Sequence, residues 1–206
     1  MPISNLDRRV ALFGRFKYSG SLVMMIGAMV LGSSLKPIAY AETDTAYRSS
    51  IAPGTWAGAS FPVEDFQAYT SPFGYRGGVT GGGSEFHSGL DLAAPEGSYV
   101  RNWWSGTVVE TIDDDRCGTG LVIKSGDWEH VYCHMQGYVE TIDGVRTLVD
   151  RDGSILVQQG QQLPTGARIG RVGMTGRTTG PHLHWGLVYQ DDWIDPATVI
   201  RAMANS

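Results

Sequence analysis

Glycine interrupts most of this chain so often that long helices have little room to form. The sequence contains 28 glycines in 206 residues, and most of them lie beyond residue 50. Short segments that contain valine, isoleucine, threonine or tyrosine run between them, such as 106–111, 120–124 and 129–134. Such runs, bounded by turn residues, are typical of β-strands, and residues 125–127 are expected to join the last two as a hairpin. We therefore predict an all-β domain.

The second half of the chain continues this pattern up to a helical end. Residues 137–156 are charged and mixed, which indicates a hairpin or a long loop inserted at the rim of the domain. Over residues 157–172 short apolar segments alternate with glycines, as in brief strands joined by tight turns. Asp195 and Pro196 predict the start of a short helix to about Met203, because aspartate caps helices and proline favours their first position. The predicted fold is mainly antiparallel β-sheet with a short C-terminal helix.

The N-terminal segment does not fit that domain. Four basic residues near the start are followed by the ten-residue apolar run 22–31 and by Ala39-Tyr40-Ala41. This order predicts a secretory signal peptide over residues 1–41, cleaved after Ala41. An uncleaved membrane anchor is the alternative, but the apolar run is only about half of the ~20 residues that a spanning helix needs. We therefore expect an exported protein, periplasmic or extracellular, without stable membrane insertion after cleavage.

The remaining chain is acidic. Residues 42–60 are small and polar and predict a linker or mobile arm, so the folded domain is expected over residues 61–206. Removing residues 1–41 leaves 11 basic and 20 acidic residues, a net charge of −9. A surface this acidic repels the phosphate backbone, which argues against nucleic acid as a partner. The sequence shows no evident internal repeat, and we expect one domain and a monomer.

Two histidines near the C-terminus, His182 and His184, begin a predicted strand after a Gly-Pro turn. Because successive strand side chains point to opposite faces, both imidazoles share one face, and Leu183 and Trp185 take the other. One imidazole could bind a metal while the other handles protons. A pair of structural histidines is the simpler alternative for an isolated His-x-His motif.

A second polar pair, His87 and Asp91, lies four residues apart after the glycine-rich loop 77–83. On an extended segment the two share a face, with Leu90 and Leu92 on the other. Imidazole and carboxylate are both good zinc ligands. An aspartate that only hydrogen-bonds a nearby histidine explains the spacing equally well. Phosphate binding is poorly supported, since no Lys-Ser/Thr follows the glycines.

A third polar cluster lies on the predicted strand 129–134. His130, Tyr132 and His134 are expected on one face of this strand and Cys133 on the other. His130 would lie about 13 Å from His134 at ~3.3 Å per residue, so both can hardly serve one small site. We select His134 as the candidate site residue and expect His130 in a loop or at the surface.

The two cysteines, Cys117 and Cys133, lie on opposite arms of the predicted hairpin. Exported proteins form disulfides, so a bridge is expected, and its loss should reduce stability rather than affect the chemistry. Two buried free thiols are the alternative. Zinc binding by the pair is disfavoured, because Cys133 is expected to point away from the face of His134.

With His130 set aside, the other four histidines, His87, His134, His182 and His184, are candidate site residues on extended segments. If their faces meet, two or three residues are available to bind a metal, and one or two imidazoles remain. That composition fits a hydrolytic zinc centre, in which three protein ligands leave one position for water. Zinc lowers the pKa of the water toward ~7 and polarises a carbonyl, and a spare histidine acts as general base.

Three linked motifs in this order resemble the lysostaphin-type zinc endopeptidases, also called the LytM family. The motifs are His87-x-x-x-Asp91, Tyr132-x-His134 and His182-x-His184, with similar surroundings from Ser-Pro-Phe-Gly-Tyr-Arg to Thr-Gly-Pro-His-Leu-His-Trp. The resemblance covers about residues 61–200. Met135 and Trp185 stand where leucine and phenylalanine are common in the family, and the insert 137–156 is long. The insert leaves the choice of substrate open.

The resemblance implies a lysostaphin-like domain, related to the duplicated-hybrid or barrel-sandwich type, with an open groove over the sheet. It implies a secreted metalloprotease that hydrolyses peptide bonds of cell-wall peptidoglycan. His87, Asp91 and His184 would bind one zinc ion per chain. His134 and His182 would perform acid–base work and steady the oxyanion.

Two other functions are compatible with parts of the sequence. Some members of the family have lost their ligands and act as non-catalytic activators of other wall hydrolases, but here every motif position is filled. The glycine pattern at 157–172 is also similar to biotinyl or lipoyl carrier modules, which need a displayed lysine. Lys124 is the single lysine beyond the predicted signal peptide, and it lacks their usual flanking residues.

Overall fold

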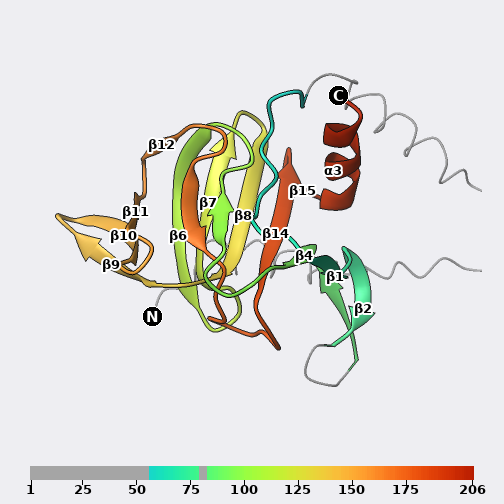
Figure 1. Cartoon of the computed structure of the whole chain (residues 1–206), viewed down its shortest axis with the longest axis horizontal. Coiled ribbons are helices and arrows are strands. Elements are labelled where there is room, and N and C mark those ends of the chain that lie inside the picture. The colour runs from blue at the N-terminus through green and yellow to red at the C-terminus, as the bar shows by residue number, and fades with distance from the viewer. Residues whose placement is uncertain (1–55, 79–82) are drawn as a thin grey trace, which may run out of the picture. The chain divides into compact units, whose positions relative to one another are not determined.

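The computed structural model describes residues 56–78 and 83–206 (Figure 1). The predicted signal peptide at 1–41 and most of the predicted linker at 42–60 lie outside these residues. Within the described part, no helix combines the length and the apolar character that a membrane span requires.

One antiparallel sheet of eight strands carries the site. Its strands are β1 (Ala68–Ser71), β4 (Gly89–Ala93), β6 (Gly106–Asp114), β7 (Gly118–Ser125), β8 (Trp128–Met135), β12 (Gln162–Leu163), β14 (His182–Tyr189) and β15 (Asp192–Ile194). Along the sheet the order is β1, β4, β14, β8, β7, β6 and β12, and β15 pairs with β14 outside that path. The predicted β7–β8 hairpin is confirmed. Since β14 lies between β4 and β8, the strands that carry Asp91, His184 and His134 are neighbours (Figure 1).

Three smaller sheets complete the strands. They consist of β9 (Tyr138–Ile142), β10 (Val145–Asp150) and β11 (Ile155–Gln158), of β5 (Tyr99–Arg101) with β13 (Arg168–Arg171), and of β2 (Gly74–Gly77) with β3 (Ser84–His87). The insert at 137–156 is therefore a hairpin of β9 and β10, which β11 extends to a three-stranded sheet. All three strands contact β6, and β10 also contacts β7. Asp143 and Gly144 form the turn of this hairpin with φ of 50° and 81°, the left-handed pair that a two-residue hairpin turn favours.

The C-terminal helix forms where it was predicted. Helix α3 (Pro196–Ala204) begins after Asp195, whose side chain accepts a hydrogen bond from the backbone N–H of Ala197. Pro196 occupies the first turn, where its missing N–H costs nothing. The helix contacts β4 and β14 and buries Val199 completely (Figure 1).

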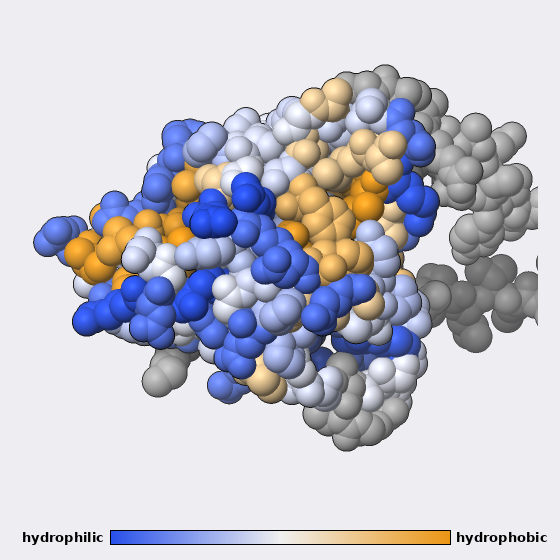
Figure 2. Space-filling view, viewed as in Figure 1, coloured by the Kyte–Doolittle hydropathy of each residue, from blue (hydrophilic) through white to orange (hydrophobic). Residues whose placement is uncertain are grey.

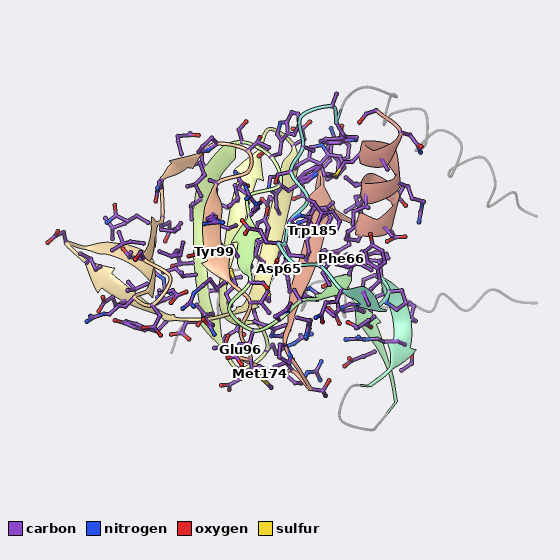
Figure 3. The ribbon with its side chains drawn as sticks, in the orientation of Figure 1. Asp65, Phe66, Glu96, Tyr99, Met174 and Trp185 are labelled. Carbon is purple, nitrogen blue, oxygen red and sulfur yellow. A yellow bond between two sulfur atoms is a disulfide. The ribbon has the colours of Figure 1, made fainter. Side chains whose placement is uncertain are left out.

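The core lies on one face of the main sheet. Leu92, Leu183 and Trp185 point there and are fully buried. Trp185 projects from β14 (Figure 3), and the centroid of its ring lies 5.8 Å from that of Trp103. Trp56 lies 4.6 Å from Trp103 and is 7% exposed. Part of the segment predicted as a linker thus packs against the domain.

His130 belongs to this core, which corrects the expectation of a loop or surface position. It stands in β8 opposite Leu187, is fully buried, and its ring centroid lies 4.7 Å from that of Trp103. Burial disfavours the charged imidazole and lowers the pKa of His130 to about 3. The prediction failed because alternation shows which residues share a face, but not which face of a strand is buried.

Candidate metal centre

The opposite face of the sheet carries two of the polar motifs in direct register. Asp91 on β4 pairs with His184 on β14, so both side chains project from the same face. Asp91 Oδ1 lies 3.0 Å from His184 Nδ1. His87 ends β3 in a different sheet, and the chain crosses at Ser88 into β4. The expected extended segment is therefore divided between two sheets, yet His87 Nε2 still lies 3.0 Å from Asp91 Oδ1.

Three atoms with lone pairs face one another in this cluster. They are His87 Nε2, Asp91 Oδ1 and His184 Nδ1. Asp91 Oδ1 lies 3.0 Å from each nitrogen, and the two nitrogens are 2.9 Å apart. His87 Nδ1 donates to the carbonyl of Pro72 at 2.7 Å, because a carbonyl can only accept. A neutral His87 therefore presents a lone pair at Nε2, and at most one proton, on His184 Nδ1, is available for the three atoms. Such a concentration of electron pairs is the arrangement that a cation stabilises.

The donor set fits zinc. Two imidazole nitrogens and one carboxylate oxygen match the ligands of catalytic zinc sites, which keep the fourth position open. Ligand atoms about 2.0–2.2 Å from a tetrahedral ion lie about 3.3–3.6 Å apart, a few tenths of an ångström beyond the spacing here. Among the described residues, His87, Asp91 and His184 form the one group of three or more potential ligands of this kind.

The segment between Ser71 and Arg76 supports the cluster. The Pro72 carbonyl orients one imidazole, as described above, and a guanidinium nitrogen of Arg76 lies 3.4 Å from Asp91 Oδ2. Arg76 also hydrogen-bonds Ser71 and pairs with Glu85 at 3.4 Å. The turn-rich motif before the glycine loop therefore contacts His87 Nδ1 and Asp91 Oδ2, the atoms of these two candidate ligands that do not face the other ligands.

The electrostatics favour an ionised Asp91 and a neutral His184. Burial alone would raise the pKa of the Asp91 carboxyl, but the hydrogen bond from His184 and the electrostatic effect of the two neighbouring imidazoles outweigh burial and lower that pKa. Burial lowers the pKa of His184, and the nearby Asp91 opposes this only in part. Both groups thus favour the protonation states that bind a metal.

His182 and His134 border the cluster. His182 Nε2 lies 3.6 Å from Asp91 Oδ1, and the ring centroids of His134 and His182 are 4.8 Å apart. Each directs its Nδ1 at a backbone carbonyl, that of Gly180 at 2.8 Å and that of Thr175 at 2.9 Å. A neutral imidazole held in this way presents a lone pair at Nε2. Burial chiefly lowers the pKa of His134 to about 4, which keeps that ring neutral at pH 7.

His134 reaches the site through an irregular backbone rather than through strand alternation. Tyr132 pairs with Trp185 and faces the core, whereas Cys133 pairs with His184 on the site face. Regular alternation would send His134 into the core, but its φ of 63° turns it back. The expectation that His134 shares a face with Tyr132 and not with Cys133 is therefore wrong.

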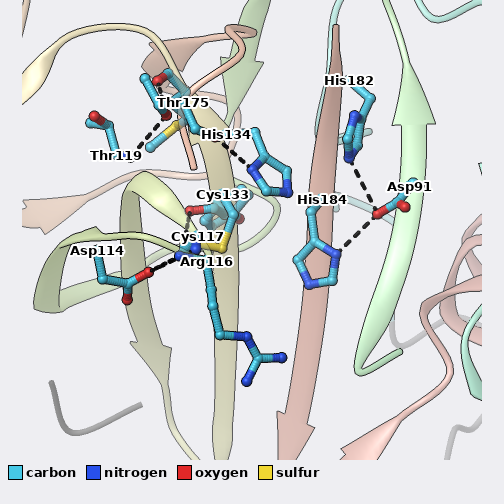
Figure 4. The surroundings of a disulfide bond; sticks show 12 residues. Asp91, Asp114, Arg116, Cys117, Thr119, Cys133, His134, Thr175, His182 and His184 are labelled. Atoms are coloured by element: carbon cyan, nitrogen blue, oxygen red, sulfur yellow. Dashed lines mark hydrogen bonds and ion pairs between the residues drawn. A yellow bond between two sulfur atoms is a disulfide. The ribbon is translucent and has the colours of Figure 1, made fainter. Parts of the chain in front are cut away.

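Cys117 and Cys133 form the predicted disulfide beside this irregularity (Figure 4). Their α-carbons are 4.8 Å apart, and both residues are buried. Figure 4 places the bond next to His134 and on the side of the sheet that carries His184. A covalent link thus lies within the surroundings of the site, although Cys133 was expected to point away from the face of His134.

A groove of about 470 Å³ opens over these side chains, as expected for this fold. Besides Asp91 and three of the histidines, it is lined by Thr70, Ser71, Arg76, Arg177, Thr178 and Thr179, among others. Arg76 and Arg177 both pair with Glu85. In a domain rich in acidic residues, the groove therefore concentrates guanidinium and hydroxyl groups.

A second hollow of about 460 Å³ lies between the insert and the segment 171–175. Tyr138 from the insert lines it together with Glu96 and Met174. Figure 3 shows Glu96 and Met174 close together at one edge of the view. Figure 2 shows apolar side chains gathered over the insert, where Leu156 is 54% exposed. The insert thus lines this second hollow and contributes no residue to the lining of the groove over the candidate metal cluster.

Gly89 and Thr175 shape the site although sequence analysis assigned them no role. A β-carbon on Gly89 would lie 2.6 Å from Cε1 of His184, so only glycine lets this ring pack against β4. Thr175 supplies the carbonyl that orients His134. The position of Gly89 inside the His-x-x-x-Asp motif could have indicated close packing at that point. The role of Thr175 has no such sign in the sequence, because it depends on a backbone carbonyl that every residue has.

Comparison with known proteins assigns the family. The family model described as Peptidase family M23 matches residues 85–148 and 138–196, which together make up more than half of the chain. The chain belongs to peptidase family M23. The M23 match includes every residue proposed above for the metal and for proton transfer.

Relatives of this M23 domain support the fold. Peptidoglycan DD-endopeptidase ShyA of Vibrio cholerae is 33% identical over 120 residues, 58% of this chain and 24% of ShyA. The chain spans about a quarter of the length of the curated relatives it matches. A zinc-containing peptidase from Vibrio cholerae is 28% identical with a TM-score of 0.54, over 71% of this chain and 39% of that one.

The lysostaphin-like fold predicted from the sequence is confirmed by a further structure. The catalytic domain of lysostaphin from Staphylococcus simulans superposes with a TM-score of 0.50 at 24% identity. The match covers 65% of this chain and 92% of that domain. At this identity the likeness concerns the fold alone.

Proposed function

We propose that this M23 domain is a zinc-dependent endopeptidase that cleaves peptide bonds of bacterial peptidoglycan. The observation that carries the proposal is the meeting of His87 Nε2, Asp91 Oδ1 and His184 Nδ1 within 3.0 Å of one another. These three residues would hold one zinc ion per chain. Membership of a peptidase family and likeness to a peptidoglycan DD-endopeptidase support hydrolysis of wall peptides.

Two imidazoles would handle the protons. Bound zinc would supply Lewis acidity for the scissile carbonyl and the attacking water. His182 would take a proton from that water at Nε2, since its Nδ1 proton is engaged by the Gly180 carbonyl. His134 would likewise accept a proton at Nε2, and it can steady the oxyanion by donation only after gaining that proton. Either ring could then pass its proton to the leaving amine.

The substrate is proposed to be a carboxylate-bearing stem peptide rather than an uncharged glycine bridge. Arg76 and Arg177 bring two guanidinium groups to the groove, and guanidinium pairs well with carboxylate. The hydroxyl oxygens of Thr70 and Thr178 can accept hydrogen bonds from the N–H groups of a peptide, since their own protons are donated to the carbonyls of Asp91 and Gly180. The name of ShyA, a peptidoglycan DD-endopeptidase, is consistent with a crosslink between stem peptides.

The enzyme is proposed to act outside the cytoplasm. Residues 1–41 would direct export to the periplasm or the exterior, and the mature chain would act there as a monomer without membrane insertion. The disulfide between Cys117 and Cys133 supports this location, because such bonds persist in oxidising compartments.

Purified exported protein tests the proposal. Metal analysis should find about one zinc per chain, and mass spectrometry of digested peptidoglycan should find new amino and carboxyl termini within stem-peptide crosslinks. His182→Ala serves as the matched control, with zinc retained and little hydrolysis. Zinc without new termini in the unmodified protein would favour the alternative, a non-catalytic activator of another wall hydrolase. Protein that binds no zinc would contradict the metal site itself.

A further inference from the structure

His134 has a backbone conformation that histidine rarely adopts. Its φ of 63° lies in the left-handed region, which is unfavourable for a residue with a β-carbon unless the surroundings enforce it. The conformation breaks the alternation of β8 and brings the imidazole to the site face, where its ring centroid lies 4.8 Å from that of His182. Whatever enforces this conformation therefore positions the imidazole.

Backbone hydrogen bonds hold His134 from two sides. Its N–H donates to the carbonyl of Cys117 at 2.8 Å, and its carbonyl accepts from the N–H of Gly173 at 2.9 Å. Its Nδ1 donates to the carbonyl of Thr175 at 2.9 Å. The histidine is thus held between the turn that joins β6 to β7 and the loop that follows β13.

The disulfide fixes the first of these contacts. Cys133 directly precedes His134, and Cys117 provides the carbonyl that accepts the His134 N–H. The disulfide thus links Cys133, the neighbour of His134 in the chain, to Cys117, whose carbonyl accepts the hydrogen bond of the His134 amide (Figure 4). Asp114 Oδ1 accepts hydrogen bonds from the N–H groups of Arg116 and Cys117 at 2.8 Å, which closes the turn without attaching it to the histidine.

The loop that follows β13 packs against the same turn, backbone to backbone. A β-carbon on Gly118 would lie 2.3 Å from the carbonyl carbon of Thr175, and one on Gly176 would lie 2.4 Å from the nitrogen of Gly118. Thr175 Oγ1 accepts from the N–H of Thr119 at 2.9 Å and donates to the carbonyl of Met135 at 2.8 Å. A shift of the turn would therefore also move the carbonyl that orients the imidazole.

We propose that the disulfide between Cys117 and Cys133 is a positioning device for His134. It keeps strand and turn at the separation at which the left-handed residue retains its hydrogen bonds. The candidate metal ligands are held by other contacts. Regular pairing of β4 and β14 holds Asp91 and His184, and the Pro72 carbonyl orients His87. The inference rests on the proposed function, in which His134 moves a proton. It replaces the expectation that this bond affects stability alone.

The double variant Cys117→Ala/Cys133→Ala tests this role, with Val199→Ala as a control of reduced stability. Val199 is fully buried in α3, among the core side chains. Well below both unfolding transitions, the double variant should keep one zinc per chain and a KM within about twofold, while kcat falls about 10- to 100-fold. The control should keep its kcat. A double variant with the kcat of the control would overturn the inference.

Hydrogen exchange at the His134 amide gives a readout that does not depend on activity. In zinc-free protein this amide should exchange at least about tenfold faster in the double variant than in the unmodified protein or in Val199→Ala, because its acceptor carbonyl is no longer held. Equal protection in all three proteins would also overturn the inference. If the unmodified protein hydrolyses nothing, the proposed function fails, and exchange alone then decides whether the disulfide holds His134.

Reduction of the folded protein covers the case in which the double variant does not fold. A phosphine reductant and water convert the disulfide into two thiols, and the phosphine becomes its oxide. Thiol titration should then find two thiols, zinc should stay bound, and kcat should fall and return after reoxidation with oxidised glutathione. Two titratable thiols with an unchanged kcat would contradict the role.

Discussion

The two halves of the candidate site are held in different ways. Asp91 and His184 stand opposite each other in the regular pairing of β4 with β14, and their ligand atoms are 3.0 Å apart. His134 stands at an irregularity of β8, where a left-handed residue depends on a disulfide and a neighbouring loop. A ladder of repeated hydrogen bonds sets the first half, and a few specific contacts set the second.

This difference predicts two separable kinds of damage. A ladder tolerates the loss of one contact, whereas a strained residue persists only while its surroundings over-determine it. We therefore expect changes at the β4–β14 pair to act on metal retention and changes around the β8 irregularity to act on turnover. The predictions that follow test this separation.

The largest effect is expected from removing a proposed metal ligand in the regular half. Asp91→Ala and His184→Ala should each reduce zinc from about one per chain to near zero and abolish hydrolysis, because two protein ligands remain where three are needed. Metal analysis after dialysis, beside the rate of peptidoglycan digestion, measures both effects. Stoichiometric zinc in either variant would show that the altered residue is not a ligand.

Removing an imidazole that is proposed to transfer protons should reduce activity while zinc is retained. His182→Ala should keep nearly stoichiometric zinc while hydrolysis falls ~10²–10⁴-fold, the usual contribution of a positioned general base. His134→Ala should behave in the same way. Zinc content and hydrolysis rate are measured on the same samples. Loss of zinc in His182→Ala, with retention in His184→Ala, would mean that the roles of these two residues are reversed.

A smaller effect on zinc is expected from crowding the regular half. The β-carbon of Gly89→Ala would meet the His184 ring at 2.6 Å, so the ring must shift. We expect zinc affinity to fall about 10- to 100-fold, as when the support of a metal ligand is removed. Gly58→Ala is the matched control, since its added carbon meets nothing within 4 Å. Equal zinc affinity in the two variants, measured by competition with a chelator, would refute this packing constraint.

The smallest effect concerns pH and lies outside both halves. Because the pKa of the buried His130 is about 3 against an ordinary 6.5, the unfolded chain alone takes up this proton as pH falls below 6.5. Stability that is present above pH 6.5 is therefore lost toward pH 3, by about 2 kcal/mol between pH 7 and 5. His130→Leu should remove that part of the decline and leave zinc and kcat unchanged. Urea unfolding at the two pH values measures it, and a decline as steep as before would contradict the assignment.

The regular half could be predicted from the sequence because it obeys alternation. His182 and His184 share one face, and Asp91 lies across the neighbouring strand from His184. The β7–β8 hairpin and helix α3 also followed from local chemistry, a glycine-containing turn and an aspartate cap before proline. In these places local preference and tertiary structure agree.

The irregular half could not be predicted in the same way. Residues other than glycine seldom occupy the left-handed region, and nothing in residues 129–134 marks the turn of the backbone at His134. Its conformation depends on contacts with a turn and a loop that are distant in sequence. For the same reason the burial of His130 and the packing of Trp56 on Trp103 were missed, since each depends on partners from remote segments.

The position of the metal tests the central claim most directly. Anomalous X-ray diffraction at the zinc absorption edge, on crystals of the zinc-loaded protein, locates the ion. We predict one peak per chain, bounded by His87 Nε2, Asp91 Oδ1 and His184 Nδ1, with His182 and His134 uncoordinated. A peak elsewhere in the chain, or His182 or His134 in place of one of the three ligands, would contradict the account.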